Sequence, residues 1–257
     1  MLIKSSGKNW LRGFYPIFRK ELFRRFSNKR WIPSLVTWIS ISAIPTISLV
    51  LGGDSTPSLD KGIGVISLFL WLGTAPMSIG TIVISQGAIV EEKLTQTLLW
   101  IFSKPLSGSA FILAKFAAYA VYIAVMMLGI PAFLVAIIAL TLGISFNLLL
   151  SFIVGLMMIY LFLLFILALT LMLGTFFQKI SFVSAAAFIV YISGGSLNVN
   201  QYLRKIEPYS YAALQRYAVE TATGNFPTLA ITAILTTFLL ITIFLFVASW
   251  KMKRYEF

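Results

Sequence analysis

The chain has 257 residues, of which 59% are hydrophobic and 11% are charged, and its mean hydropathy is +0.94. A soluble domain is only about half apolar, so this composition is typical of a membrane protein. The formal net charge is +12, and the chain has neither histidine nor cysteine. These two absences exclude Ser-His and Cys-His catalysis, disulfides and the usual zinc or copper sites.

The first 30 residues carry nine basic side chains and precede the first long apolar run. Their apolar residues at 11, 14, 15, 18, 22 and 26 share one helical face. This pattern favours an interfacial amphipathic helix, with Pro16 in its first turn, over a plain cytoplasmic tether. The residues expected to define its two faces are Phe18, Arg19, Lys20, Leu22, Arg24 and Phe26. No small-residue cleavage pattern follows, which argues against a cleavable signal peptide.

Apolar segments long enough to be candidate membrane spans follow the basic segment, since a spanning helix needs about 20 apolar residues. There are six of them, at about 31–51, 63–86, 111–142, 148–173, 181–197 and 228–250. The third is too long for one upright span, so we expect its start at 111–116, interrupted by Lys115, to lie at the inner surface. The fifth is short. Pro76 and Pro131 predict kinks in the second and third segments.

The distribution of basic residues predicts the orientation, because lysine and arginine accumulate on the cytoplasmic side of a membrane. With six spans and the N-terminus inside, the inner segments hold 16 of the 20 basic residues. The inner segments are 1–30, 87–115, 174–180 and 251–257, and the outer ones are 52–62, 143–147 and 198–227. The basic residues follow this topology and show no base-stacking module, so no nucleic-acid partner is expected.

The sequence thus predicts an all-α membrane protein with an interfacial helix in 1–30, a six-span domain in 31–257 and both termini cytoplasmic. No Asp, Glu, Lys or Arg lies deep within a predicted span, which argues against proton-coupled transport. Sodium coordination by backbone carbonyls stays open.

The phosphate-binding pattern GxxxxGK[ST] is also absent, and GTFFQK at 174–179 has the wrong spacing for it. Any ATP hydrolysis must therefore occur on another polypeptide. SGGS at 193–196 is interpreted as a helix end or a site of close packing.

The inner loop at 87–110 contains an apolar pattern that predicts a helix lying against the inner face of the bundle. The residues that repeat at three- and four-residue spacing are Ile89, Val90, Leu94, Leu98, Ile101 and Phe102. Glu91, Glu92 and Lys93 are expected at the start of this helix, where unpaired backbone N–H groups favour negative charge. Pro105 is expected to end it.

The stretch EKLTQTLLWIFSKPLSGSAFILAKF at 92–116 resembles the first cytoplasmic loop of type 2 ABC transporter permeases, whose usual form is close to EREEGTLELLLSRPVSRxEILLGKF. The positions that match outright are Glu92, Thr97, Leu98, Ser103, Pro105, Ser107, Lys115 and Phe116. Lys93 and Lys104 keep the charge of the corresponding arginines. Gln96 stands where the family has glycine, and Leu99 stands where it often has glutamate.

The resemblance implies a permease subunit of an ABC exporter in the bacterial plasma (inner) membrane. Two permease subunits, identical or homologous, would form the pathway within the membrane lipid. Two cytoplasmic ATPase subunits would bind ATP and magnesium beneath them, and this chain would hold no cofactor. The residues expected to couple to the ATPase are Glu91, Glu92, Lys93, Gln96, Thr97, Lys104 and Pro105. The inner loop at 174–181 would supply a second contact, and the outer segment at 198–227 would form short helices near the exit of the pathway.

Two other interpretations remain open at this point. In the first, the chain is a non-transporting membrane anchor or immunity-type subunit that recruits a cytoplasmic partner through the same loop. In the second, the charged residues only solvate the inner loop and contact no partner. No pathway residues are assigned. Hydroxyl residues of the first span more often serve helix packing than transport; they are Thr37, Ser40, Thr46 and Ser48. The 22 phenylalanines fit a hydrophobic cargo and lipid contact equally well.

Overall fold

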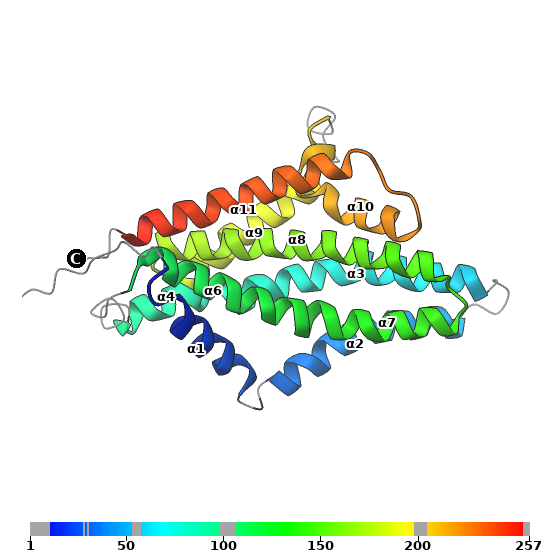
Figure 1. The fold of residues 1–257 in the computed structure, drawn as a ribbon, viewed down its shortest axis with the longest axis horizontal. Helices are drawn as coiled ribbons and strands as arrows, with labels where there is room; N and C mark the ends of the chain where they lie inside the picture. The colour runs from blue at the N-terminus through cyan, green and yellow to red at the C-terminus, as the bar shows by residue number, and fades with distance from the viewer. Residues whose placement is uncertain are drawn as a thin grey trace, which may run out of the picture.

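A computed structural model of the chain describes residues 11–27, 29, 31–52, 58–97, 106–197 and 205–253. These residues form helices joined by turns, and no strand occurs among them. The long helices run side by side along the length of the molecule, and α1 lies obliquely across one end of the bundle (Figure 1). The prediction of an all-α fold is therefore confirmed for the described part of the chain.

The helices follow one another in this order: α1 Phe14–Phe26, α2 Trp31–Gly52, α3 Ser58–Ser85, α4 Gly87–Leu94, α6 Gly108–Tyr122, the π-helix η1 Ile123–Gly129, α7 Ile130–Thr141, α8 Phe146–Phe176, α9 Ile180–Ser196, the 3-10 turn η3 Glu207–Tyr209, α10 Ala213–Ala222 and α11 Ala230–Lys253. The N-terminal helix α1 and the C-terminal end of α11 lie at the same end of the bundle (Figure 1).

Five of the helical runs in the described residues are long and apolar enough to cross a membrane. They are Trp31–Gly52, Leu59–Leu94, Gly108–Thr141, Phe146–Phe176 and Ala230–Lys253. The remaining predicted span, 181–197, corresponds to α9, which has 17 residues. At a rise of 1.5 Å per residue it extends only about 25 Å, less than a hydrocarbon core of about 30 Å. The helices therefore support a multi-pass membrane protein, whereas a sixth crossing stays a prediction.

The third predicted span differs from expectation at its start. Its first residues do not form a separate surface segment, because α6 begins at Gly108 and continues through η1 into α7. Phe111 and Lys115 are both fully buried in the bundle. Near the predicted kink, the widened turn of η1 comes directly before Pro131, and the N–H of Ile130 bonds to the carbonyl of Val125. Gly129 is needed there, because a Cβ would lie 2.6 Å from the Ala124 carbonyl oxygen.

Helix α8 occupies the centre of the molecule and packs against α3, α6, α9, α10 and α11. One close approach is made by α10. A Cβ on Gly155 of α8 would lie only 2.6 Å from the backbone carbonyl of Ala218. The glycine thus lets the two backbones pass at a distance that a side chain would forbid, as small residues do at helix interfaces in membranes.

The segment predicted as the outer loop at 198–227 contains short helices, as expected, but its described part packs along the bundle. At the start of α10, the ring of Tyr211 stacks on Phe165 with centroids 4.2 Å apart. Beyond its other end, Gly224 lies beside Leu148. Helix α10 therefore runs antiparallel to the N-terminal half of α8 and covers it.

Candidate functional site

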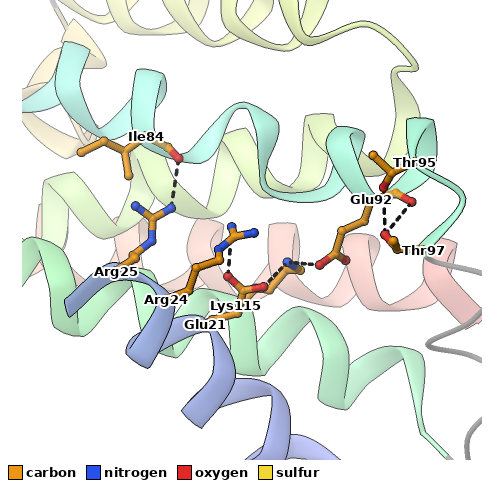
Figure 2. Close-up of polar contacts among 8 residues, drawn as sticks. All are labelled: Glu21, Arg24, Arg25, Ile84, Glu92, Thr95, Thr97 and Lys115. Carbon is orange, nitrogen blue, oxygen red and sulfur yellow. Dashed lines mark hydrogen bonds and ion pairs between the residues drawn. The ribbon is translucent and has the colours of Figure 1, made fainter. Parts of the chain in front are cut away.

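The candidate coupling site is a buried charge cluster at the end of the bundle where α1, α4 and α6 meet. We define the cluster by Glu21, Arg24, Glu92 and Lys115. Lys115 Nζ lies 2.7 Å from Glu21 Oε1 and 2.9 Å from Glu92 Oε1, so one lysine joins two carboxylates from different helices (Figure 2). Arg24 Nη2 lies 3.3 Å from the second oxygen of Glu21. The side chains of Lys115 and Glu21 are 0% and 1% exposed.

The local sequence of α1 explains how a carboxylate reaches this buried position. Glu21 follows Phe14 and Phe18 at helical spacing, so it lies on the face that α1 packs against α6. It is the buried residue of α1. An isolated ionised carboxylate in such a place would be costly, and the facing ammonium group of Lys115 compensates its charge.

The charges around Glu21 also determine its protonation. Burial by itself would raise the pKa of the Glu21 carboxyl group. The attraction and hydrogen bond from Lys115, with smaller contributions from Arg24 and Arg25, outweigh burial and hold that pKa below its ordinary value. Glu21 is therefore a carboxylate at neutral pH, and its pairing with Lys115 is ionic.

Arg25 adds a further connection between α1 and the bundle. Its guanidinium carbon lies 3.8 Å from the ring centroid of Tyr119 and 5.3 Å from that of Tyr122, both on α6. Arg25 Nη2 also donates to the carbonyl of Ile84 on α3, at 3.3 Å (Figure 2). A guanidinium stacked on aromatic rings is stabilised by cation–π attraction. Helix α1 is thus held to α3 and α6 by polar as well as apolar contacts.

Lys93 ties α4 to the C-terminal end of α8. Its Nζ donates to the carbonyls of Gly174 at 2.8 Å and Thr175 at 2.7 Å, and lies 3.4 Å from the carbonyl of Phe177. The last carbonyls of a helix lack intrahelical partners and carry partial negative charge, so a lysine there is favourable. The two inner loops expected to contact a partner, 87–110 and 174–181, are therefore joined to each other directly.

The structure corrects the expected position of the loop carboxylates. Helix α4 ends at Leu94, and Gln96 has a left-handed backbone with φ of 54°. Glu91, Glu92 and Lys93 thus lie in the last turn of α4 rather than at the start of a helix. Carboxylates are unfavourable at a helix C-terminus. Glu92 is compensated by Lys115, while Glu91 is exposed.

The remaining predicted coupling residues divide between exposed and undescribed positions. Gln96 and Thr97 are exposed, and the hydroxyl of Thr97 lies 2.9 Å from that of Thr95 (Figure 2). Lys104 and Pro105 lie outside the described residues. The structure therefore divides the predicted set: Glu92 and Lys93 make internal contacts, and Glu91, Gln96 and Thr97 face outward.

The predicted interfacial residues mostly follow the expected two faces. Arg19, Lys20 and Arg24 are exposed, whereas Phe18, Leu22 and Phe26 are partly buried; Tyr15 departs from the pattern at 66% exposed. The hydroxyls of Thr37, Thr46 and Ser48 donate to carbonyls of their own helix; Thr46 is buried, whereas Thr37 and Ser48 are exposed. Gly194 of the SGGS stretch packs against Tyr211, also as expected.

Sequence reasoning missed Glu21 and Arg25, although a signal was present. Glu21 is a carboxylate within an otherwise basic segment, and it shares a helical face with Phe14 and Phe18. A charged residue inside an apolar stripe predicts a buried partner, since unpaired buried charges are rare. The identity of that partner could not be read from the helix itself.

The cluster links α1, α4 and α6 through ion pairs. In the described part of the chain, no three His, Cys, Asp or Glu side chains are grouped so that they could hold a metal ion. What the arrangement provides is a connection from the loop beginning at Glu91 to α1, α6 and α8 at once.

Comparison with known proteins adds no assignment to this geometry. No protein-family model matches the chain, and no curated protein matches it either.

Proposed function

We propose that the protein is the membrane-spanning permease subunit of an ATP-driven ABC exporter, coupled to separate ATPase subunits through the loop that begins with α4. The observation that carries this proposal is the connection of α4 to three other helices. Glu92 reaches Lys115 and through it Glu21, and Lys93 holds the end of α8. A force applied to the outward-facing end of α4 would thus reach α1, α6 and α8 together.

In this proposal the residues of the loop have separate roles. Glu91, Gln96 and Thr97 are exposed and would contact the ATPase, while Glu92 and Lys93 would transmit its movement into the bundle. Charged groups at the rim of an interface determine orientation and rate of docking more than affinity. The excess of basic residues in the same segments supports a cytoplasmic location for this end of the molecule.

The test is to purify the tagged chain from its native membranes in mild detergent without ATP and to identify the proteins that copurify. We expect an ATPase with a phosphate-binding loop in a stoichiometric complex. The variant Glu91→Lys should lower the amount of bound ATPase by about fivefold or more, because a lysine there places like charges opposite each other across the interface, which lowers affinity far more than the loss of a rim pair does.

The matched control for that variant is Asp60→Lys, which makes the same change at an exposed carboxylate in the first turn of α3, far along that helix from α4. This control should copurify with as much ATPase as the native chain does. Purification without any ATPase, or equal binding by Glu91→Lys, would overturn the proposal.

A further inference from the structure

A second buried carboxylate lies beside a cavity at mid-length of the bundle, far along α3 and α8 from the charge cluster. The cavity has a volume of about 490 Å³ and lies between α3, α8, α9 and α10. Trp71 and Phe162, which line it, are near the middles of α3 and α8. A cavity of 300–1,000 Å³ is the size that usually holds a small organic ligand.

The buried charged residue among those that line this cavity is Glu207, in the 3-10 turn η3 that leads into α10. Glu207 is 1% exposed, and its Oε2 lies 3.1 Å from Arg216 Nη2. Its other oxygen, Oε1, is buried and has no hydrogen-bond partner among the described residues. Glu21 Oε2 and Glu92 Oε2 of the charge cluster are in the same state, but Glu207 is also part of the cavity lining. A ligand in this cavity can therefore supply the donor that Glu207 lacks.

The balance of charge at the cavity favours a cation. Glu207 and Glu220 supply two carboxylates, and Arg216 supplies the balancing guanidinium among the described lining residues. Arg216 lies within 3.6 Å of Glu220 as well and is 46% exposed, so its charge is shared and partly solvated. The last turn of α9 also borders the cavity through Gly194 and Gly195, and a helix C-terminus carries partial negative charge.

Four of the other lining residues are aromatic, and the remainder are Ile192, Ala212, Gln215 and Val219. Trp71, Phe162, Tyr191 and Tyr211 surround the cavity, and Phe162 lies 6.2 Å from Tyr211 and 6.4 Å from Tyr191 between ring centroids. Aromatic rings around a carboxylate are the recurring means by which proteins bind substituted ammonium groups. A strongly hydrated inorganic cation would gain little from such walls.

We propose that this cavity binds an organic ammonium group carried on an apolar body. The ammonium group would lie against Glu207 Oε1 and the aromatic rings, and the apolar body would fill the remaining volume. The ligand is either a free amphipathic amine or the headgroup of a lipid, since both present the same chemistry. The proposal does not depend on the exporter function, because binding to the isolated chain requires no ATPase.

The test uses the purified chain in lipid nanodiscs of phosphatidylglycerol, titrated calorimetrically with phenyltrimethylammonium. Benzenesulfonate, of similar size and opposite charge, is the ligand control. We expect saturable binding of the cation and none of the anion. Glu207→Gln should weaken cation binding by about tenfold or more, because it removes the buried charge but keeps the shape.

Two further variants separate the charge from the cavity. Gly195→Leu places a side chain where a Cβ meets no atom within 4 Å, so it should fill the cavity and abolish binding without changing any charge. Asp60→Asn removes an exposed carboxylate elsewhere and should leave binding unchanged. If Glu207→Gln does not fold, Gly195→Leu alone tests the site.

The source of the ammonium group is distinguished by a second lipid composition. Nanodiscs with half phosphatidylcholine are compared with nanodiscs with half uncharged galactolipid, which have the same surface charge. Weaker binding of the probe in phosphatidylcholine would identify a lipid headgroup as the occupant, and equal binding would identify a free organic cation. Equal binding of benzenesulfonate, or native affinity in both Glu207→Gln and Gly195→Leu, would overturn the proposal.

Discussion

The two buried carboxylates Glu21 and Glu207 are placed in opposite circumstances. Glu21 faces a lysine that is 0% exposed. Glu207 faces an arginine that is 46% exposed, and a cavity of about 490 Å³ opens beside it. A carboxylate compensated by a buried partner holds helices together, whereas one with a partly exposed partner at the edge of a cavity is available to a ligand.

The largest expected effect comes from breaking the compensation at the first site. Lys115→Met would leave Glu21 and Glu92 without the lysine that they share. Removing one partner of a buried ion pair typically costs about 3–5 kcal/mol in the free energy of unfolding. We expect a clear drop in the thermal unfolding temperature in detergent and faster proteolysis of α1.

The control for this variant is Lys20→Met, which removes an exposed lysine from α1 and should unfold at nearly the native temperature. Combining Lys115→Met with Glu21→Gln should recover part of the lost stability, since fewer buried charges are then uncompensated. Equal unfolding temperatures for Lys115→Met and Lys20→Met would contradict a structural role for the cluster.

A smaller effect is expected from disturbing the helix that carries Arg216 to Glu207. Gly155→Ala places a methyl group 2.6 Å from the backbone carbonyl of Ala218, so α10 must move away from α8. Overpacking of this kind costs about 1–3 kcal/mol in the free energy of unfolding. It should also weaken phenyltrimethylammonium binding, because α10 forms one wall of the cavity.

Gly52→Ala is the matched control, because a Cβ there meets nothing within 4 Å. Its unfolding temperature and its affinity for the probe should both equal those of the native chain. Native behaviour of Gly155→Ala in both measurements would show that α10 is not held by this contact.

The smallest effect is expected from acid, which neutralises Glu21 without changing the side chain. Because the folded-state pKa of Glu21 is lowered, its contribution to stability is present above the unfolded pKa and is lost as the pH falls through the folded value. The unfolded pKa of glutamate is about 4.3. We therefore expect the native unfolding temperature to fall on acidification below that pH.

The groups that act on Glu21 in this titration are Lys115 from α6 and Arg24 and Arg25 from α1, with Glu92 of α4 on the far side of Lys115. Glu21→Gln should start from a lower unfolding temperature and lose less of it on acidification. If the two proteins show the same decrease between pH 7 and pH 3, Glu21 does not contribute through its charge.

The sequence by itself determined the class of the molecule and the positions of its main helices. Apolar runs predicted α2, α3, α8 and α11 to within several residues at each end, because a helix in lipid must satisfy its own backbone and be apolar around its surface. The same reasoning predicted helix α1 and its exposed cations Arg19 and Lys20. These features depend on local composition and spacing, which a sequence displays directly.

Only the tertiary structure decided which charges meet. Glu21, Glu92 and Lys115 are separated by 71 and 23 positions, and their pairing depends on how α1 crosses α6 beside α4. Likewise, Glu207 belongs by sequence to a polar loop, and the antiparallel packing of α10 on α8 brings that loop to the middle of the bundle. Hydropathy along the sequence shows which residue would be costly to bury. The charged partner that offsets this cost lies on another helix, so it can be identified only once the packing of the helices is known.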